Sequence, residues 1–272
     1  MNGVEHHYGR GRTLDTIVEA LRLAGQDPAR LRPEDLAPVD EFHIRGREAT
    51  VELARRPAFE PGSRVLDVGC GLGGSARYLA AEHRCHVTGI DLTREYVDAA
   101  NALAGMVRLG DRVAFRQASA LDLPFEDGRF DAVWTEHVQM NIADKRAFYR
   151  EIARVTRPGG LLVFHDVFQG DGGPLHYPVP WAEEPSISFL AAPGDVRRIL
   201  EEVGFVVNAW LDTSESSLQW FVATIEKLTA TGPPPLGLHL LMGETAQAKF
   251  ENITRNLREG RAVVYQARAE RR

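Results

Sequence analysis

Cysteines, long apolar runs and excess positive charge are all scarce or missing in this sequence. Its 272 residues include two cysteines, Cys70 and Cys85, which exclude a disulfide framework and a cysteine-rich metal site and indicate a reducing compartment. No apolar stretch approaches the roughly 18 residues that a membrane-spanning helix needs. Residues 1–12 lack the apolar core of a secretory signal. We therefore expect a soluble, cytoplasmic protein with no metal ligand set and no membrane partner.

The charge balance is mildly acidic, with 32 Lys and Arg against 38 Asp and Glu and a net charge of −6. This balance argues against a protein whose main task is to bind nucleic-acid phosphates. Hydrophobic residues make up 44% and charged residues 26%, as in average globular proteins, so neither disorder nor a fibrous protein is expected. The length suits one large domain or two small ones. We expect a monomer or a homodimer.

The spacing of apolar residues changes near residue 60. Before it, Thr13–Ala24 and about Gly46–Arg56 have helical spacing on either side of a proline-punctuated stretch, and we interpret residues 1–60 as an N-terminal helical cap. After it, short apolar strands alternate with helices, which is typical of a Rossmann-like α/β fold with a doubly wound, mostly parallel sheet. The expected strands are 65–68, 87–90, 113–116, 130–134, 161–164, 205–211 and 262–267, and the expected helices are 75–82, 94–103, 147–155, 195–202 and 243–258.

Residues 166–194 interrupt this alternation. They are rich in glycine and proline and include the aromatic residues Tyr177, Trp181 and Phe189. A loop this long inside a compact domain usually has a function. We therefore expect residues 61–272 to form one domain, with residues 166–194 inserted as a lid over a ligand.

A glycine-rich turn follows the first expected strand. It reads Asp-Val-Gly-Cys-Gly-Leu-Gly-Gly over residues 67–74, and Asp91 ends the second strand. Glycines let a ligand approach the backbone beside the positive end of a helix, and a carboxylate at the end of the second strand can accept both hydroxyl groups of a ribose. These features predict nucleotide binding and also fit the fingerprint of dinucleotide enzymes. Asp67 suits a ligand with an ammonium group, which a pyrophosphate lacks.

At these residues the chain resembles the class I S-adenosylmethionine-dependent methyltransferases. The family motif, an acid followed by three alternate glycines, is met by Asp67, Gly69, Gly71 and Gly73, and the further matches are Asp91, residues 120–125, residues 130–134 and residues 157–160. The resemblance covers about residues 60–210. It implies S-adenosylmethionine as cofactor and a nitrogen, oxygen or carbon nucleophile of a small molecule as methyl acceptor. Within the family, the chain looks like sarcosine/dimethylglycine N-methyltransferases and natural-product methyltransferases.

The resemblance also implies a cofactor site. The backbone at Gly69 and Gly71 would hold the methionine portion with Asp67 behind it, and Asp91 would bind the ribose. Ser119 departs from the family, which often has aspartate there, and its hydroxyl is a weaker acceptor for the adenine amino group. The residues expected at the cofactor are Asp67, Gly69, Cys70, Gly71, Gly73, Asp91, Leu92, Ala118, Ser119, Ala120, Glu136 and His137.

The segments after the fourth and fifth strands contain the candidate catalytic residues, His137 and His165. Ligands of parallel sheets lie beyond the carboxyl ends of the strands, so His137 is placed as a general base, as a hydrogen-bonding partner of the substrate, or as a wall of the cofactor pocket. Adjacent strand residues point to opposite faces, so we expect only one of His165 and Asp166 to reach the site. The residues expected at the methyl acceptor are Tyr8, His43, Met140, Asn141, His176 and Trp181.

Two other functions fit the same residues. A nicotinamide-dependent oxidoreductase would share the glycine turn and the ribose acid. A protein on the same fold could retain the cofactor without transferring a methyl group. A DNA adenine methylase is disfavoured, because Trp134-Thr135-Glu136-His137 stands where those enzymes carry an Asn/Asp-Pro-Pro-Tyr/Trp loop.

Overall fold

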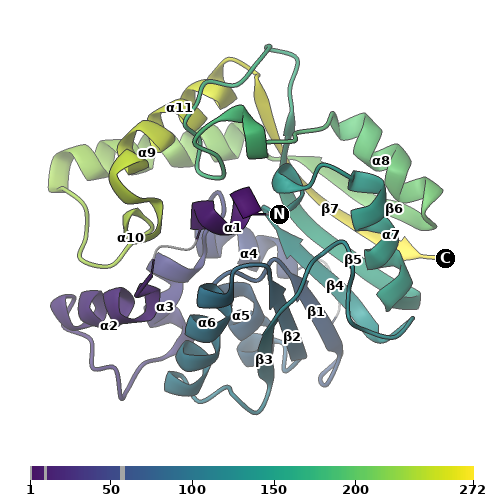
Figure 1. Ribbon diagram of the computed structural model, residues 1–272, viewed down its shortest axis with the longest axis horizontal. Coiled ribbons are helices and arrows are strands. Elements are labelled where there is room, and N and C mark those ends of the chain that lie inside the picture. The colour runs from purple at the N-terminus through teal and green to yellow at the C-terminus, as the bar shows by residue number, and fades with distance from the viewer. Residues whose placement is uncertain (1, 9–10, 56–58) are drawn as a thin grey trace.

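A single sheet organises the computed structural model (Figure 1), which describes residues 2–8, 11–55 and 59–272. In these residues seven strands lie in the order β3-β2-β1-β4-β5-β7-β6. All neighbouring strands are parallel except β7, which is antiparallel to both β5 and β6. The strands are β1 (Arg64–Val68), β2 (His86–Asp91), β3 (Val113–Gln117), β4 (Phe130–Glu136), β5 (Thr156–Gln169), β6 (Phe205–Asp212) and β7 (Ala262–Arg271).

Helices cover both faces of this sheet. Along β4, Val133 packs into one buried cluster and Trp134 into another, the alternation expected of a strand buried on both sides. The doubly wound, mostly parallel α/β fold predicted from the sequence is therefore confirmed. The helices of one face are α4 (Gly46–Ala54), α5 (Gly74–Glu82) and α6 (Arg94–Met106), and those of the other are α7 (Lys145–Val155) and α8 (Pro193–Glu202).

Helices from both ends of the chain form the cap near the carboxyl ends of the strands. Figure 1 shows α1 between the sheet and the helices α9 to α11. The sequence predicted a cap of residues 1–60. In the structure α4, from that range, packs on a face of the sheet instead, and the cap also includes helices from the C-terminal part of the chain. The helices of the cap are α1 (Asn2–Tyr8), α2 (Thr13–Leu23), α3 (Pro33–Asp40), α9 (Ser214–Thr231), α10 (His239–Met242) and α11 (Ala246–Arg258).

The two parts of the cap pack against each other and against the sheet domain. Leu21 of α2, Leu36 of α3, Leu103 of α6 and Leu241 of α10 belong to one buried cluster. Burial of this shared apolar surface holds the cap over the strand ends. None of the helices in the described part of the chain is long and apolar enough to cross a membrane.

The segment expected as a lid is only partly a loop. Residues 166–169 continue β5, which is paired with β7 as far as Gln169, and the loop begins after them. Within the loop, Val179 and Trp181 are buried in a cluster with Phe250 and Ile253 of α11. The segment therefore packs against α11 instead of lying free over the sheet, and its aromatic residue Trp181 is buried in the protein interior.

Candidate active site

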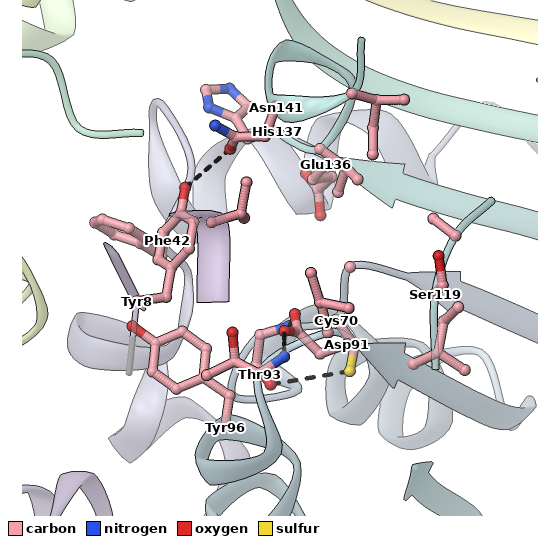
Figure 2. A pocket seen from close by; sticks show the side chains of 18 of the residues that line it. Tyr8, Phe42, Cys70, Asp91, Thr93, Tyr96, Ser119, Glu136, His137 and Asn141 are labelled. Atoms are coloured by element: carbon pink, nitrogen blue, oxygen red, sulfur yellow. Dashed lines mark hydrogen bonds between the residues drawn. The ribbon is translucent and has the colours of Figure 1, made fainter. Parts of the chain in front are cut away.

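A cavity of about 600 Å³ lies between the cap and the carboxyl ends of β1, β2 and β4 (Figure 2). Ligands of open parallel sheets bind at this edge, and cavities that hold small ligands measure about 300–1,000 Å³. The position and the volume suit a nucleoside-sized cofactor together with a second small molecule.

The turn over residues 69–73 forms one wall of this cavity. The N–H groups of Gly69 and Cys70 both donate to the carbonyl oxygen of Ile90, at 2.8 and 2.9 Å, which fixes the turn to β2. Gly69 has φ 72°, and a Cβ there would lie 2.2 Å from Cγ2 of Val138. Gly71 has φ 52°, with open space where its Cβ would stand. Glycine at these two positions lets the turn pack against its neighbour on one side and accept a ligand on the other.

Asp91 ends β2 beside this turn. Its Oδ2 accepts a hydrogen bond from the N–H of Gly71 at 3.0 Å, and its Oδ1 accepts one from the N–H of Thr93 at 2.8 Å. Burial raises the pKa of the carboxyl group, while the hydrogen bonds from Thr93 and Gly71 act against the rise. Each oxygen keeps a second lone pair. The side chain is therefore held in place and can accept both hydroxyl groups of a ribose.

Asp67, near the end of β1, is 3% exposed, and its Oδ2 has no hydrogen-bond partner among the described residues. Burial, followed by the nearby carboxyl groups of Glu136 and Asp91, raises the pKa of Asp67 well above its usual value. A buried polar atom without a partner is unfavourable. An ammonium group in the cavity would supply a partner and stabilise the charged form, so this residue fits a ligand that carries an amine.

Ser119 lies at the opposite end of the cavity from Tyr8 and Phe42 in Figure 2. Ala118, Ala120 and Leu92 also line the cavity. The hydroxyl oxygen of Ser119 accepts a hydrogen bond from the N–H of Leu121 at 3.2 Å, which closes a small turn. The end of the cavity at Ser119 thus has an apolar surface on which a planar base can pack and one hydroxyl group that can form a hydrogen bond with it.

Glu136, at the end of β4, is the centre of a buried polar network. Its Oε2 accepts hydrogen bonds from Ser75 Oγ at 2.5 Å and from Trp134 Nε1 at 2.8 Å, and it lies 3.5 Å from Nε2 of His43. Burial acts to raise the pKa of Glu136, but the charge of His43, the ring of His165 at 3.8 Å and the hydrogen bond from Ser75 lower it to about 2. Glu136 is thus ionised and already paired, and it acts as a fixed part of the wall.

His43 provides the positive charge of this network. Its Nε2 lies 2.9 Å from Oε2 of Glu41. Burial acts to lower the pKa of His43, but Glu136 and Glu41 raise it to about 9. The ring is therefore an imidazolium shared by two carboxylates.

His137 follows β4 with a left-handed backbone, φ 53°. Its N–H donates to the carbonyl oxygen of His165 at 2.8 Å, and its Nε2 accepts from the N–H of Ile44 at 3.4 Å. Burial, followed by the charges of His165 and His43, lowers the pKa of His137 well below 6.5. The ring is neutral, and because Nε2 is an acceptor, the ring proton lies on Nδ1. A neutral imidazole with one N–H donor therefore lines the cavity.

The hydroxyl group of Tyr8 donates to Oδ1 of Asn141 at 3.2 Å (Figure 2). The Nδ2 of Asn141 donates to the carbonyl oxygens of Trp181 and Ile187, at 3.0 and 2.8 Å. The amide donors of Asn141 are thus both used within the protein. This residue joins α1 and the 181–187 segment to the end of β4, and it closes one end of the cavity.

The comparisons with known proteins agree with this geometry. Residues 66–164 match the family described as a methyltransferase domain. The O-methyltransferase resE of Aspergillus sclerotiorum is 30% identical over 225 residues, which cover 81% of this chain and 83% of that protein. The chain belongs to the S-adenosylmethionine-dependent methyltransferase family.

Two other matches to methyltransferases are more limited. The chloroplastic tocopherol O-methyltransferase of Arabidopsis thaliana is 44% identical over 100 residues, which span 37% of this chain and 29% of that protein. The structure of phosphoethanolamine N-methyltransferase 2 of Haemonchus contortus, in complex with S-adenosyl-L-methionine, has a TM-score of 0.76 at 17% identity. It covers 98% of this chain and 60% of that one, and at this identity the likeness shows the fold alone.

Most residues predicted to form the methyltransferase site lie around one cavity. Their functional roles stay predictions, but the structure brings their side chains or backbone to its walls. The predicted residues that line the cavity are Tyr8, His43, Asp67, Gly69, Cys70, Gly71, Asp91, Leu92, Ala118, Ser119, Ala120, Glu136, His137 and Asn141.

Five predicted placements are corrected. Gly73 is the N-cap of α5 and does not line the cavity, and a Cβ there would lie 2.4 Å from Phe115. His165 is fully buried, with its ring centroid 4.9 Å from that of His137, so it supports the wall without lining it. Met140 and Trp181 are 3% and 1% exposed and belong to the core under the cap. His176 pairs with Glu259 at 2.9 Å, away from the cavity.

Sequence reasoning missed several residues of the methyltransferase cavity. The unpredicted residues near Tyr8 and Asn141 include Val4, Tyr96, Ile187 and Leu241. They come from four separate segments and belong to no motif. Only the tertiary arrangement of the cap brings them together.

Proposed function

We propose that this chain transfers a methyl group from S-adenosylmethionine to a nitrogen, oxygen or carbon nucleophile of a small molecule. The observation that supports the proposal most directly is the buried, unpartnered oxygen of Asp67 beside the glycine turn and Asp91. A ligand with an ammonium group and a ribose would satisfy both carboxyl groups. S-adenosylmethionine carries both, whereas a nicotinamide dinucleotide has no ammonium group. This difference favours the methyltransferase over the oxidoreductase.

Different residues of the cavity would contact different parts of the cofactor. Asp67 and the backbone at Gly69 and Gly71 would hold the methionine portion, and Asp91 the ribose. Leu92 and the segment 118–120 would enclose the adenine. The bound cofactor supplies an electrophilic methyl group on a sulfonium.

The contribution of the chain to methyl transfer is alignment of the acceptor and exclusion of water. Correct orientation of two reactants can supply about 7–11 kcal/mol of a barrier. The neutral ring of His137, with its proton on Nδ1, would orient the nucleophilic group by a hydrogen bond. We propose that His165 is a positioning residue, since its carbonyl oxygen accepts from the N–H of His137 and its ring packs against the ring of His137. The hydrogen bond between Tyr8 and Asn141 would close the end of the cavity that holds the methyl acceptor.

A pair of cofactor fragments tests the assignment of Asp67. S-adenosylhomocysteine carries the amino-acid portion, and 5′-deoxy-5′-methylthioadenosine lacks it. Asp67→Asn should weaken the binding of S-adenosylhomocysteine about tenfold, since a charged hydrogen bond contributes about 1.5–3 kcal/mol. Binding of methylthioadenosine should stay within twofold of the wild type. Equal loss for both ligands would contradict the role of Asp67.

A labelled-methyl assay tests the activity itself. The protein is incubated with methyl-labelled S-adenosylmethionine and a panel of small phenols, amines and carbon acids, and the label is followed into the acceptor. Transfer of label with formation of S-adenosylhomocysteine is the expected result. Binding of NADH and not of S-adenosylhomocysteine would indicate an oxidoreductase. Tight binding of S-adenosylhomocysteine without label transfer to any acceptor would indicate a protein that retains the cofactor but does not methylate.

We also propose that the protein works in the cytoplasm, in the metabolism of small molecules. Cys70 and Cys85 are both buried and unpaired, which suits a reducing compartment.

A further inference from the structure

The acidic side chains of the cavity that have no cationic partner lie at its cofactor end. None of the described residues that line it is a lysine or an arginine. Its acidic side chains are Asp40, Asp67, Asp91 and Glu136. Asp40 forms a buried ion pair with Arg77, and Glu136 shares the charge of His43. The remaining two acids are those assigned to the cofactor.

The cation at the cavity wall, His43, is not available to a ligand. Its Nε2 lies between Oε2 of Glu41, at 2.9 Å, and Oε2 of Glu136, at 3.5 Å, and Thr50 Oγ1 lies 3.2 Å from the same nitrogen. Glu41 also pairs with Arg47, at 2.6 Å, so two carboxylates compensate the imidazolium and this guanidinium. An anion that entered the cavity would meet no free positive charge among the described residues.

The acceptor end is mostly apolar. Phe42 contacts the ring of Tyr8 with centroids 6.1 Å apart, and Leu241 belongs to the cluster on which both residues pack. The carbonyl oxygen of Ile187 accepts a hydrogen bond from the side-chain amide of Asn141. Ile187 lines the cavity together with Val4. The polar groups here are neutral and include the phenols of Tyr8 and Tyr96, the hydroxyl of Ser186, the amide of Asn141 and the ring of His137. This surface would bind an apolar body and one or two hydrogen-bonding groups.

We infer that the methyl acceptor is an uncharged, largely apolar molecule, and not a phosphate ester, a diphosphate or an amino acid. The inference rests on the proposed function, since it takes the cofactor to fill the end that contains Asp67 and Asp91. Burial of a phosphate or carboxylate with no counter-charge is strongly unfavourable, whereas burial of apolar surface against Val4, Phe42, Ile187 and Leu241 is favourable.

A pair of probes with one skeleton tests this inference. The protein is saturated with S-adenosylhomocysteine and titrated with 2-naphthol or with 2-naphthyl phosphate, and binding is followed by naphthyl fluorescence. We expect 2-naphthol to bind at least tenfold more tightly than the phosphate. Leu241→Lys, which adds a cation to the acceptor wall, should narrow or reverse this preference. Leu23→Lys is the matched control, because Leu23 is 70% exposed on α2, and it should keep the wild-type ratio.

Equal or tighter binding of 2-naphthyl phosphate to the wild-type protein would overturn the inference, as would failure of 2-naphthol to bind at all. The wild-type comparison stands even if Leu241→Lys does not fold. A calorimetric titration with S-adenosylhomocysteine alone distinguishes failure of the proposed function from failure of the inference about the acceptor. If that ligand does not bind, the proposed function fails. If it binds and the phosphate probe is preferred, only the inference about the acceptor fails.

Discussion

The Nε2 of His43 lies 3.5 Å from Oε2 of Glu136, although 93 residues separate the two in sequence. This contact joins the segment between α3 and α4 to the end of β4. Because Glu136 also holds Ser75 at the start of α5, the cap, the glycine turn and the sheet meet in one ionised network. The shape of the cofactor cavity therefore depends on the charge state of this pair.

The pair makes stability depend on pH. The pKa of His43 is raised from 6.5 to about 9, so its contribution is complete below pH 6.5 and is lost as the pH rises toward 9. The pKa of Glu136 is lowered from 4.5 to about 2, so its contribution is complete above pH 4.5 and is lost as the pH falls toward 2. Stability from the pair is greatest between these limits.

Replacement of His43 by glutamine tests this dependence. The loss of unfolding free energy between pH 6.5 and 9 should be smaller in His43→Gln than in the wild type, by up to about 3 kcal/mol, as measured by urea unfolding. His86→Gln, at an exposed site on β2, should keep the wild-type pH dependence. Parallel pH curves for His43→Gln and the wild type would refute the charge assignment.

Gly69 is the position of the turn where a side chain is least tolerated. Gly69→Ala places a Cβ 2.2 Å from Val138 in a left-handed backbone, so we expect a loss of at least about 2 kcal/mol in unfolding free energy and weaker binding of S-adenosylhomocysteine. Gly105→Ala in α6 meets nothing within 4 Å and should change stability by no more than about 1 kcal/mol. Urea unfolding of both variants makes the comparison. A fully stable Gly69→Ala protein would contradict the structure of the turn.

Tyr8→Phe removes the hydrogen bond to Asn141. Such a bond contributes about 0.5–1.5 kcal/mol, so KM for an acceptor should rise about three- to tenfold. The Kd of S-adenosylhomocysteine should stay within twofold, because Asn141 lies at the acceptor end. Tyr78→Phe, in α5 and outside the cavity lining, serves as the control. A change in cofactor Kd without a change in acceptor KM would reverse this assignment.

The low pKa of His137 predicts a flat pH profile. With a pKa well below 6.5, the ring is neutral between pH 6.5 and 8, so kcat/KM should show no inflection from this residue in that range. His137→Asn suits the left-handed backbone and should lower kcat about tenfold, as expected for a lost hydrogen bond, and not the hundredfold or more of a lost general base. A fall in kcat/KM below about pH 6.5 that is present in the wild type and absent in His137→Asn would show that the ring acts as a base.

The sheet and the glycine turn at the cofactor site could be predicted because the residues that form them are close together in the sequence. The residues from Asp67 to Gly74 are contiguous, and Asp91 lies at the end of the next strand, so the strand-turn-helix pattern brings them together. The acceptor wall gives no such signal. Val4, Ile187 and Leu241 lie on α1, in the loop and on α10, and they meet only after the cap has packed.

Among the helices that the sequence did not predict, α3 and α9 were missed for different physical reasons. The helix α3 occupies a stretch that its prolines mark as irregular, but Pro33 stands in its first turn, where proline is tolerated. In α9 the buried residues are Ser217 and Phe221, so it lacks the regular apolar stripe on which a prediction from spacing depends. His176 and Trp181 were assigned to a lid because aromatic residues suit one. In the folded chain Glu259 binds the first and the core buries the second.

Binding of S-adenosylhomocysteine is the most direct test of the proposed cofactor site at Asp91. Isothermal titration calorimetry is carried out on the wild type, on Asp91→Asn and on Asp98→Asn, which changes an exposed acid of α6 paired with Arg94. We expect the wild type to bind, Asp98→Asn to bind equally well, and Asp91→Asn to bind ten- to a hundredfold more weakly. No binding to the wild type, or wild-type affinity in Asp91→Asn, would contradict the proposed cofactor site.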